Sequence, residues 1–245
     1  MKQVFLTVAE NKPLTKDVFL MTLCGDVSQI KTPGQFINIK LDGFYLRRPI
    51  SVCDSNDKDC VTIIYKAVGE GTKAMSALKN GHVLDVLTGL GNGFDVALSG
   101  DNPILIGGGV GTPPMYYLAK KLIEHGKNVT VILGFNTADE VFFKQEFEKL
   151  GAKTVITTVD GSVGVKGFVT DALKDISEYS YTYACGPEPM LKAVYNTSRV
   201  SGQYSFEERM GCGFGACMGC SCKTKYGNKR ICKEGPVLVK EEIIW

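Results

Sequence analysis

The sequence lacks a charge excess of one sign, a long apolar run and any low-complexity segment. Its 245 residues carry a formal net charge of +2, which gives no electrostatic reason to expect nucleic acid or an anionic membrane as a partner. No apolar run approaches the roughly 20 residues that a membrane span needs. The residues after Met1 lack the apolar core of a signal peptide. We therefore expect a cytoplasmic protein.

Cysteine, by contrast, is plentiful. The nine cysteines are an odd number, which does not suit a framework made only of disulfides. Five of them lie close together near the C-terminus, at Cys212, Cys217, Cys220, Cys222 and Cys232. Such clustering is typical of metal ligation in a reducing compartment. Cys24, Cys53 and Cys60 lie in strand-like segments, and we expect them to be buried as small hydrophobic residues.

Four of the clustered cysteines have the spacing C-x4-C-x2-C-x11-C, which matches the plant-type ligand pattern of a [2Fe-2S] cluster. The predicted ligands are Cys212, Cys217, Cys220 and Cys232. The glycines of this loop suit a chain that wraps closely around an inorganic core. Cys222 forms C-x-C with Cys220 and is an alternative ligand. A structural zinc site is a second alternative, although zinc ligands usually come as two well-separated pairs.

The chain divides into three predicted domains. Residues 1–97 contain short apolar runs at 4–8, 18–23, 35–39 and 61–65, separated by turn residues, as in an antiparallel β-barrel. One helix is predicted at 72–79. Residues 98–202 alternate strands with helices, which indicates a doubly wound parallel sheet. Residues 203–245 form the small cluster domain, so the predicted fold class is multidomain, β and α/β.

Within the second domain we predict strands at 103–106, 129–133, 154–159 and 181–185, and helices at 115–124, 139–150 and 188–200. The run Gly107-Gly108-Gly109-Val110-Gly111 follows the first of these strands and precedes a helix. In that context the backbone can approach a pyrophosphate, and the helix start offers free N–H groups. No acidic residue ends the second strand, so this rule leaves NAD or NADP open.

The segment Cys185-Gly186-Pro187-Glu188 lies at the carboxyl end of the last predicted strand, where open α/β sheets bind ligands. Beside a nicotinamide ring, Cys185 would pack against the reacting carbon without offering a strong competing acid. A purely structural cysteine is the alternative interpretation.

The first domain contains Arg47 and Arg48 next to Pro49, Ile50 and Ser51. Adjacent strand residues point to opposite faces, so one arginine points inward and needs an anion. A phosphate is a suitable partner, and solvated surface arginines are the alternative. Gly69-Glu70-Gly71-Thr72 opens the predicted helix and offers a second set of phosphate-facing N–H groups. Two such sites favour a bound dinucleotide in the barrel.

Together these motifs resemble the ferredoxin-reductase-like flavoproteins and, more narrowly, the electron-transfer subunits of NAD-linked (type B) dihydroorotate dehydrogenases. The resemblance covers essentially the whole chain. It is carried, in this order, by Arg48–Ser51, Gly69–Thr72, Gly89–Phe94, Gly107–Gly111, Cys185–Met190 and the four-cysteine frame.

The resemblance implies that the barrel binds FAD and that the second domain binds NAD as co-substrate. Ser51 near the flavin N5 and Cys185 near the nicotinamide are the residues expected at the reacting atoms. The residues implied to contact a cofactor are Arg48, Pro49, Ile50, Ser51, Ile64, Tyr65, Lys66, Gly71, Thr72, Gly107, Gly108, Gly109, Val110, Gly111, Gly186, Pro187 and Glu188. Among them, Arg48 is expected to pair with the flavin pyrophosphate.

The family's partner is a separate FMN-containing catalytic subunit that oxidises dihydroorotate, in a heterotetramer with two copies of each chain. The implied route of electrons is FMN of the partner, [2Fe-2S] cluster, FAD and then NAD+, as a step of pyrimidine biosynthesis. Two alternatives remain. One is the flavoprotein subunit of a ferredoxin:NADP oxidoreductase or sulfide dehydrogenase, in which an aspartate replaces one cysteine ligand. The other is a zinc-stapled nucleotide-binding protein that is not an enzyme.

Overall fold

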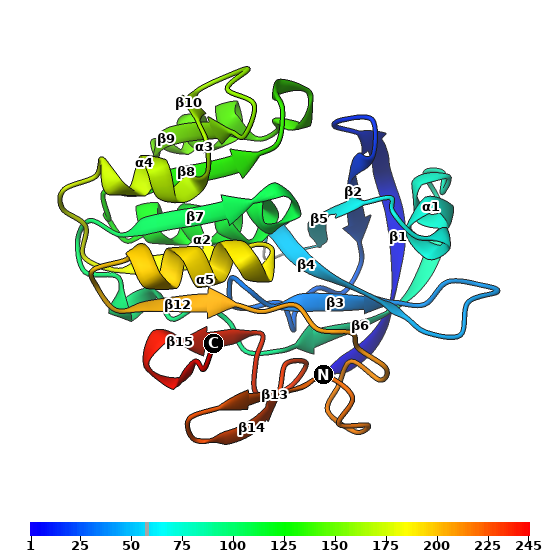
Figure 1. Ribbon diagram of the computed structural model, residues 1–245. Coiled ribbons are helices and arrows are strands. Elements are labelled where there is room, and N and C mark those ends of the chain that lie inside the picture. The colour runs from blue at the N-terminus through cyan, green and yellow to red at the C-terminus, as the bar shows by residue number, and fades with distance from the viewer. Residues whose placement is uncertain (57–58) are drawn as a thin grey trace.

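The computed structural model describes residues 1–56 and 59–245 and contains a barrel, a sheet covered by helices and a small cysteine-rich segment (Figure 1). The barrel strands are β1 (Lys2–Pro13), β2 (Val18–Cys24), β3 (Phe36–Ile39), β4 (Arg48–Ser55), β5 (Cys60–Lys66) and β6 (Val83–Leu90). They close in the order β1-β2-β5-β4-β3-β6, with antiparallel pairing between neighbours. The predicted antiparallel barrel is confirmed.

The barrel forms because apolar residues alternate along its strands. In β1, Val4, Leu6 and Val8 are buried while Phe5 between them is exposed. Alternate side chains of a strand point to opposite faces, so the alternation fills the barrel interior from every strand. Helix α1 (Glu70–Ser76) packs beside β1 and contributes Met75 to this core.

Helix α1 begins two residues before its predicted start. Gly69 precedes the helix, and the Thr72 hydroxyl accepts hydrogen bonds from the backbone N–H groups of Val68 and Gly69. This hydroxyl therefore satisfies donors at the start of the helix. The helix ends at Ser76 rather than at 79.

The second domain is a seven-stranded sheet in the order β10-β9-β8-β7-β11-β12-β15. Its strands are β7 (Ile104–Gly108), β8 (Thr130–Phe135), β9 (Lys153–Thr158), β10 (Val165–Lys166), β11 (Thr182–Cys185), β12 (Gly202–Ser205) and β15 (Val237–Val239). All neighbouring pairs are parallel except β12 and β15. The helices are α2 (Thr112–Glu124), α3 (Lys144–Leu150), α4 (Val169–Lys174) and α5 (Glu188–Thr197).

The helices cover both faces of this sheet. Leu105 and Val131 pack with Leu118 of α2 and Phe147 of α3. Ile104, Ile106 and Ile132 face α4 and α5 on the other side of the sheet (Figure 1). Neighbouring residues of each strand thus serve opposite layers, as expected for a buried parallel strand. The predicted doubly wound sheet is confirmed.

The predicted helix at 139–150 is wrong in its first part. A 3-10 turn at Ala138–Glu140 is followed by extended chain, and α3 begins only at Lys144. Phe143, directly before the helix, has a φ of 66°. Its ring packs against Tyr116 with centroids 5.2 Å apart, while Phe142 is buried. Burial of Phe142 and the packing of Phe143 on Tyr116 decide the path of this stretch against its helical pattern.

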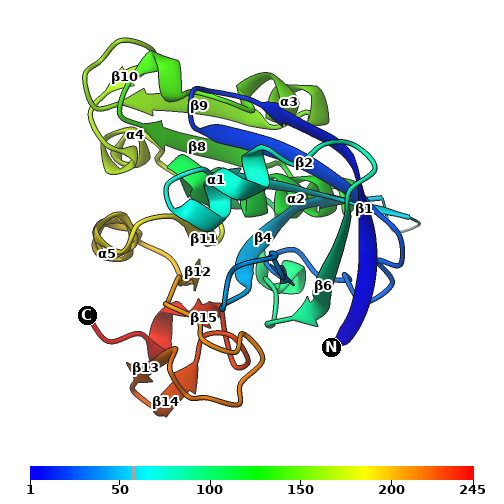
Figure 2. The same ribbon diagram turned by 90° about the vertical axis from the view of Figure 1, so that its right-hand side faces the viewer.

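The cysteine-rich segment leaves the sheet after β12 and returns to it as β15. Between these two hydrogen-bonded strands it first forms a loop of residues 206–220, called here the ligand loop because it carries Cys212, Cys217 and Cys220. The hairpin of β13 (Ser221–Thr224) and β14 (Gly227–Arg230) follows. Figure 2 shows this orange-to-red segment below β12 and β15. The expected domain boundary at 202/203 falls inside β12, so the sheet contains residues from both sides of it.

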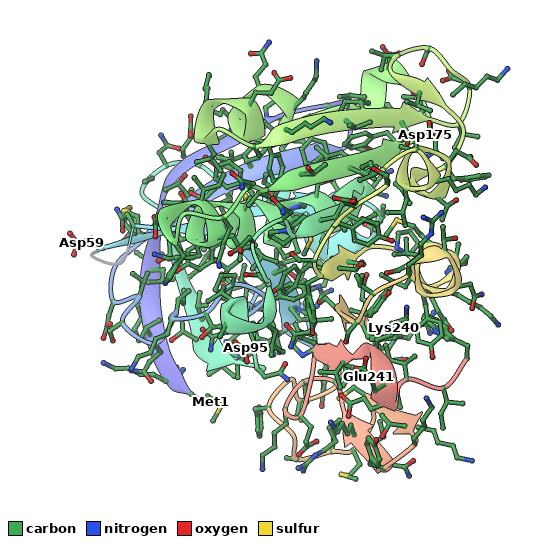
Figure 3. The ribbon with its side chains drawn as sticks, turned by 90° about the vertical axis from the view of Figure 1, so that its left-hand side faces the viewer. Met1, Asp59, Asp95, Asp175, Lys240 and Glu241 are labelled. Atoms are coloured by element: carbon green, nitrogen blue, oxygen red, sulfur yellow. A yellow bond between two sulfur atoms is a disulfide. The ribbon has the colours of Figure 1, made fainter. Side chains whose placement is uncertain are left out.

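Polar contacts tie the returning chain to the sheet and the barrel. The Lys240 Nζ donates to the carbonyls of Ser198 and Val200, at 2.7 and 3.0 Å, beyond the end of α5. Figure 3 shows Lys240 and Glu241 in this region. The barrel and the second domain meet where α2 packs on β4, and the Lys120 Nζ of α2 lies 2.8 Å from Asp54 of β4.

Among the described residues, no helix is both long and apolar enough to cross a membrane.

The expectation for two of the three barrel cysteines is wrong. Cys24 of β2 and Cys60 of β5 face each other in the strand pairing and form a disulfide. Both are only partly buried. The sequence separates them by 36 residues, so only the strand register reveals the pairing. Cys53 is fully buried, as predicted.

Replacing Cys24 and Cys60 together by serine should destabilise the oxidised protein by about 2–4 kcal/mol, because the disulfide restricts the unfolded chain. The measurement is the denaturant midpoint of the oxidised wild type and of the double variant. Wild-type protein kept reduced is the control and should unfold with the variant. Equal midpoints for oxidised and reduced wild type would contradict this prediction.

Candidate functional site

The four predicted cluster ligands lie on the ligand loop and on the segment just after β14. Cys212 and Cys217 are on the outer part of the loop, whereas Cys220 and Cys232 are buried. Backbone N–H groups point at their sulfurs: Ala216 N lies 3.2 Å from the Cys212 Sγ, and Cys232 N lies 3.4 Å from the Cys220 Sγ. Donors of this kind stabilise thiolate ligands and tune the potential of an iron–sulfur cluster.

The four cysteines associate as two pairs. Cys212 and Cys217 are joined by N–H to sulfur contacts of 3.4 and 3.5 Å in the two directions. Cys220 and Cys232 are joined by the contact of 3.4 Å. Within residues 1–56 and 59–245, no three Cys, His, Asp or Glu side chains converge as one metal ion would require. Two thiolate pairs suit two irons, so the donor set fits a [2Fe-2S] cluster.

The loop also prepares the thiols unequally for ligation. Burial raises the pKa of Cys212, but backbone N–H donors of Phe214, Cys217 and Ala216 outweigh it and lower the pKa to about 6. Burial, with the neighbouring Cys220 thiol, raises the pKa of Cys232 to about 12. Cys212 is therefore the more acidic of these two thiols, because its sulfur accepts backbone N–H donors that the buried Cys232 largely lacks.

Cys222, the alternative ligand, occupies a different environment. It is the second residue of β13, pairs with Lys229 of β14 and packs against the apolar core beneath the hairpin. Burial raises the pKa of its thiol. These features favour a structural role for Cys222 and agree with the expected ligand set of four other cysteines, which remains a prediction.

The barrel separates the two adjacent arginines. The Arg47 guanidinium binds the Asp85 carboxylate with two contacts of 2.9 Å and also donates to the Asp85 carbonyl at 2.9 Å. The Arg48 guanidinium lies 4.7 Å from the centre of the Phe44 ring and has no carboxylate partner in the part of the chain that the structure describes. Arg47 therefore has a structural anion, and Arg48 is the arginine available to a phosphate.

Gly71 faces this second arginine. A Cβ added at Gly71 would overlap the Arg48 guanidinium. The start of α1 thus lies directly against Arg48, and only glycine leaves room for the two groups. Thr72, the neighbouring predicted contact, uses its hydroxyl to cap the helix.

On β5 the three predicted flavin contacts point in different directions. Tyr65 is buried in the barrel core, and its hydroxyl donates to Asn11 Oδ1 at 3.0 Å. Only its main chain remains for a ligand outside the barrel. Ile64 packs with the core of the second domain. Lys66 lies 3.3 Å from Asp17 and lines a small cleft together with Gly109 and Val110.

The glycine turn and the Cys185 segment meet at adjacent strand ends. Cys185 is directly opposite Gly107 in the pairing of β11 with β7. A Cβ at Gly111 would overlap the Cys185 carbonyl, and one at Gly108 would overlap the Met190 side chain. Gly109 has a φ of 52° and open space where a Cβ would be. Two of these glycines therefore permit close packing, and Gly109 presents backbone to the cleft.

Burial raises the pKa of the half-buried Cys185 thiol to about 12. The thiol is therefore neutral at physiological pH and neither gives up nor accepts a proton readily. Gly186 and Pro187 follow it at once and lead into α5, which begins at Glu188. The structure thus brings together the glycine turn and the Cys185 segment, as one crevice above the sheet requires.

Sequence reasoning missed one residue on the outer face of β3 and β4. Phe36 and Asn38 of β3 are opposite Ser51 and Pro49 of β4, so these four side chains share one face. Phe36 packs with the core that includes Cys220 and Cys232. The Asn38 Nδ2 donates to the Cys212 carbonyl at 3.3 Å. The available signal in the sequence was an asparagine between two apolar strand residues, Ile37 and Ile39, and the structure shows that its side chain is buried.

Comparisons with known proteins agree with this architecture. Residues 207–244 match the iron–sulfur cluster binding domain of dihydroorotate dehydrogenase B, and residues 105–196 match an oxidoreductase NAD-binding domain. The dihydroorotate dehydrogenase B (NAD(+)) electron transfer subunit of Fusobacterium nucleatum is 45% identical over 97% of this chain and 96% of that protein. The subunit of the same name from a Geobacillus species is 44% identical over 100% and 99%.

Solved structures show the same fold. That of an NADH-dependent reduced ferredoxin-NADP oxidoreductase matches with a TM-score of 0.90 and 31% identity, covering 99% of this chain and 90% of that one. A Neisseria gonorrhoeae ferredoxin NADP+ reductase matches with a TM-score of 0.69 at 17% identity, covering 80% of this chain and 90% of that one.

The fold and the four-cysteine loop define an electron-transfer protein of the ferredoxin-reductase type, with an NAD-binding domain and a C-terminal iron–sulfur domain. The chain belongs to the family of dihydroorotate dehydrogenase B (NAD(+)) electron transfer subunits. The match of the cysteine-rich segment to an iron–sulfur domain overturns the zinc alternative.

Replacing Cys220 by serine should abolish the two-iron visible absorbance and EPR signal, because a buried ligand has no substitute. Replacing Cys222 by serine should leave both signals in place, since its thiol packs under the hairpin. The measurement is iron content and EPR of dithionite-reduced, reconstituted protein. Loss of the cluster in the Cys222 variant, with the Cys220 variant intact, would reverse the ligand assignment.

Proposed function

We propose that this chain carries electrons from the FMN of a separate dihydroorotate-oxidising subunit through its own [2Fe-2S] cluster and FAD to NAD+. The observation that carries the proposal is the hydrogen bond between Asn38 of the barrel and the Cys212 carbonyl. It joins a cluster ligand to the face of β3 and β4 that also holds Ser51. The flavin site, on this proposal, therefore lies between the cluster and the crevice of the second domain.

The order of the centres follows from electron counting. NAD+ accepts two electrons as a hydride, whereas an iron–sulfur cluster passes one at a time. Bound FAD supplies the exchange between two-electron and one-electron transfer. The task of the chain is to hold these groups at fixed separations and to exclude competing reactions.

Within this proposal, Arg48 binds the flavin pyrophosphate, and Gly71 with Thr72 closes the phosphate site from the start of α1. Pro49, Ile50 and Ser51 continue along β4 beside the flavin, with Ser51 near N5. Two features support this assignment: among the described residues the Arg48 guanidinium has no carboxylate partner, although it donates to the Leu46 carbonyl, and it lies directly against Gly71 at the start of α1. On β5, Ile64 and Lys66 contribute side chains, and Tyr65 contributes main chain.

For NAD, the proposed contacts are Gly107, Gly108, Gly109, Val110 and Gly111 at the pyrophosphate and Gly186, Pro187 and Glu188 near the nicotinamide. Cys185 is proposed to pack against the nicotinamide. A neutral thiol, whose pKa burial raises to about 12, adds polarisable surface there and does not divert the hydride as a proton donor would.

The partner subunit is proposed to dock over the ligand loop, in a heterotetramer with two copies of each chain. Phe214 and Met218 lie on this loop, next to the proposed ligands, and their exposed fractions are 42% and 54%. Exposed apolar side chains beside a redox centre suit a surface that another protein covers. We also propose a cytoplasmic location, because the free cluster cysteines need a reducing compartment, and on this proposal the Cys24–Cys60 disulfide forms only under oxidising conditions.

Holoprotein without its partner should oxidise NADH with ferricyanide and should not turn over dihydroorotate, since the dihydroorotate-oxidising site belongs to the partner subunit. The measurement is the rate of each reaction with the purified chain, before and after the FMN subunit is added. Failure to reduce ferricyanide with FAD bound would refute the proposed route, as would dihydroorotate oxidation by the chain alone.

Replacing Arg48 by leucine should weaken FAD binding about 10–100-fold, because a charge-assisted contact to phosphate contributes about 1.5–3 kcal/mol. The measurement is FAD affinity by flavin fluorescence after removal of the cofactor. Arg47→Leu is the matched control: it breaks the pair with Asp85 and should lower the melting temperature more than the FAD affinity. The reverse ranking would assign the phosphate to Arg47.

A further inference from the structure

The side chain of Asn38 is buried, yet its amide group uses a donor and leaves its acceptor oxygen unpaired among the described residues. The residue is 1% exposed and lies on β3 between the barrel-core residues Ile37 and Ile39. Its Nδ2 donates to the Cys212 carbonyl at 3.3 Å. Its Oδ1 is buried and has no hydrogen-bond partner among the residues that the structure describes. An unpaired buried carbonyl oxygen costs about 1–3 kcal/mol unless something binds it.

The backbone of the ligand loop packs directly against the Asn38 side chain at Gly213, where a Cβ would not fit. Gly213, the residue after Cys212, has a φ of 76°, and a Cβ built on it would overlap Asn38 Nδ2. Glycine alone combines this backbone conformation with this contact. The loop is therefore shaped around Asn38, although 174 residues separate the two hydrogen-bonded residues in sequence.

The strand register places Asn38 on the flavin side of the barrel. Asn38 is opposite Pro49, and Phe36 on the same face is opposite Ser51. The neighbouring residues Ile37 and Ile39 point into the barrel core instead. Asn38 thus lies on the face of the segment proposed to line the flavin, and it touches the loop that carries the first cluster ligand.

We propose that Asn38 is the positioning residue between flavin and cluster: Nδ2 holds the Cys212 carbonyl, and the buried Oδ1 accepts a hydrogen bond from an N–H or O–H donor of the bound flavin. The inference rests on the proposed function only in taking this face as the flavin site and the four cysteines as ligands. One carboxamide would then fix both redox groups to the same rigid strand.

Two substitutions separate the two halves of the proposal. Asn38→Leu has similar size but neither donor nor acceptor. Its loss of the acceptor should weaken FAD binding about tenfold. Its loss of the N–H dipole beside the cluster should shift the cluster midpoint potential downward and alter the EPR g values, because donors stabilise the more negative reduced state. Asn38→Asp keeps an acceptor oxygen and, at an alkaline pH where its buried carboxyl is ionised, has no donor for the Cys212 carbonyl. At that pH FAD affinity should stay near wild type while the cluster signals change, and both should approach wild type when the carboxyl is protonated at lower pH.

Asn92→Leu is the matched control. Asn92 also joins the barrel to the cysteine-rich segment, through the carbonyls of Glu234 and Val237 at 3.0 and 2.9 Å and the Val237 N–H at 3.1 Å. Its side-chain donors and its acceptor oxygen are all used, and its hydrogen-bond partners are Glu234 and Val237 of the returning chain rather than residues 206–220. This variant should lower the melting temperature and leave FAD affinity, EPR and potential unchanged.

The measurements are FAD titration, EPR and redox potentiometry on full-length, reconstituted holoprotein. An unchanged EPR signal and an unchanged cluster midpoint potential in both Asn38 variants would overturn the proposal. Equal changes in the Asn92 variant would also overturn it, because Asn38 would then act only as one more contact between the barrel and the cysteine-rich segment. None of these readouts uses dihydroorotate or the partner subunit. A failed dihydroorotate assay would therefore refute the proposed function and leave this inference standing.

Discussion

The interaction on which the architecture depends is the close contact between the outer face of β3 and the cysteine ligand loop. Asn38 donates to the Cys212 carbonyl, Gly213 leaves no Cβ in the way, and Phe36 packs with the core around Cys220 and Cys232. Electron transfer between two centres requires that their separation does not vary. A buried hydrogen bond and a packed aromatic ring restrict it more firmly than a surface loop would.

The topology makes this contact possible. The cysteine-rich segment is not a tail but a connection between two paired strands, β12 and β15, and Asn92 of the barrel holds the returning chain through three hydrogen bonds. Both ends of the ligand loop are therefore anchored, one in the sheet and one between sheet and barrel (Figure 2). The helix α2 completes the arrangement by packing the second domain on β4, the strand that carries Arg48 and Ser51.

Neighbouring residues of the same type have different tasks in this molecule. Arg47 forms a structural ion pair with Asp85, whereas Arg48 beside it lies over the Phe44 ring and donates to the Leu46 carbonyl, with no carboxylate partner among the described residues. Gly108 and Gly111 allow close packing against Met190 and Cys185, while Gly109 presents backbone to the cleft. Cys220 and Cys232, two of the proposed ligands, are joined by an N–H to sulfur contact, whereas Cys222 packs against the apolar core beneath the hairpin. In each case the residue type matches the motif, and the surrounding contacts decide its use.

The barrel, the doubly wound sheet and the spacing of the four cluster cysteines could all be predicted from the sequence, because alternation, strand–helix order and ligand spacing are local patterns. The start of α3, the strands β12 and β15 and the Cys24–Cys60 disulfide could not, because burial of Phe142, edge pairing and strand register depend on distant parts of the chain. The same holds for Asn38. Its sequence neighbours show only a polar residue in an apolar strand, whereas its role depends on a glycine loop that arrives 174 residues later. The sequence by itself determined which groups could bind iron, phosphate and nucleotide; the tertiary structure alone decided which of them meet, since that depends on contacts between residues that no local pattern connects.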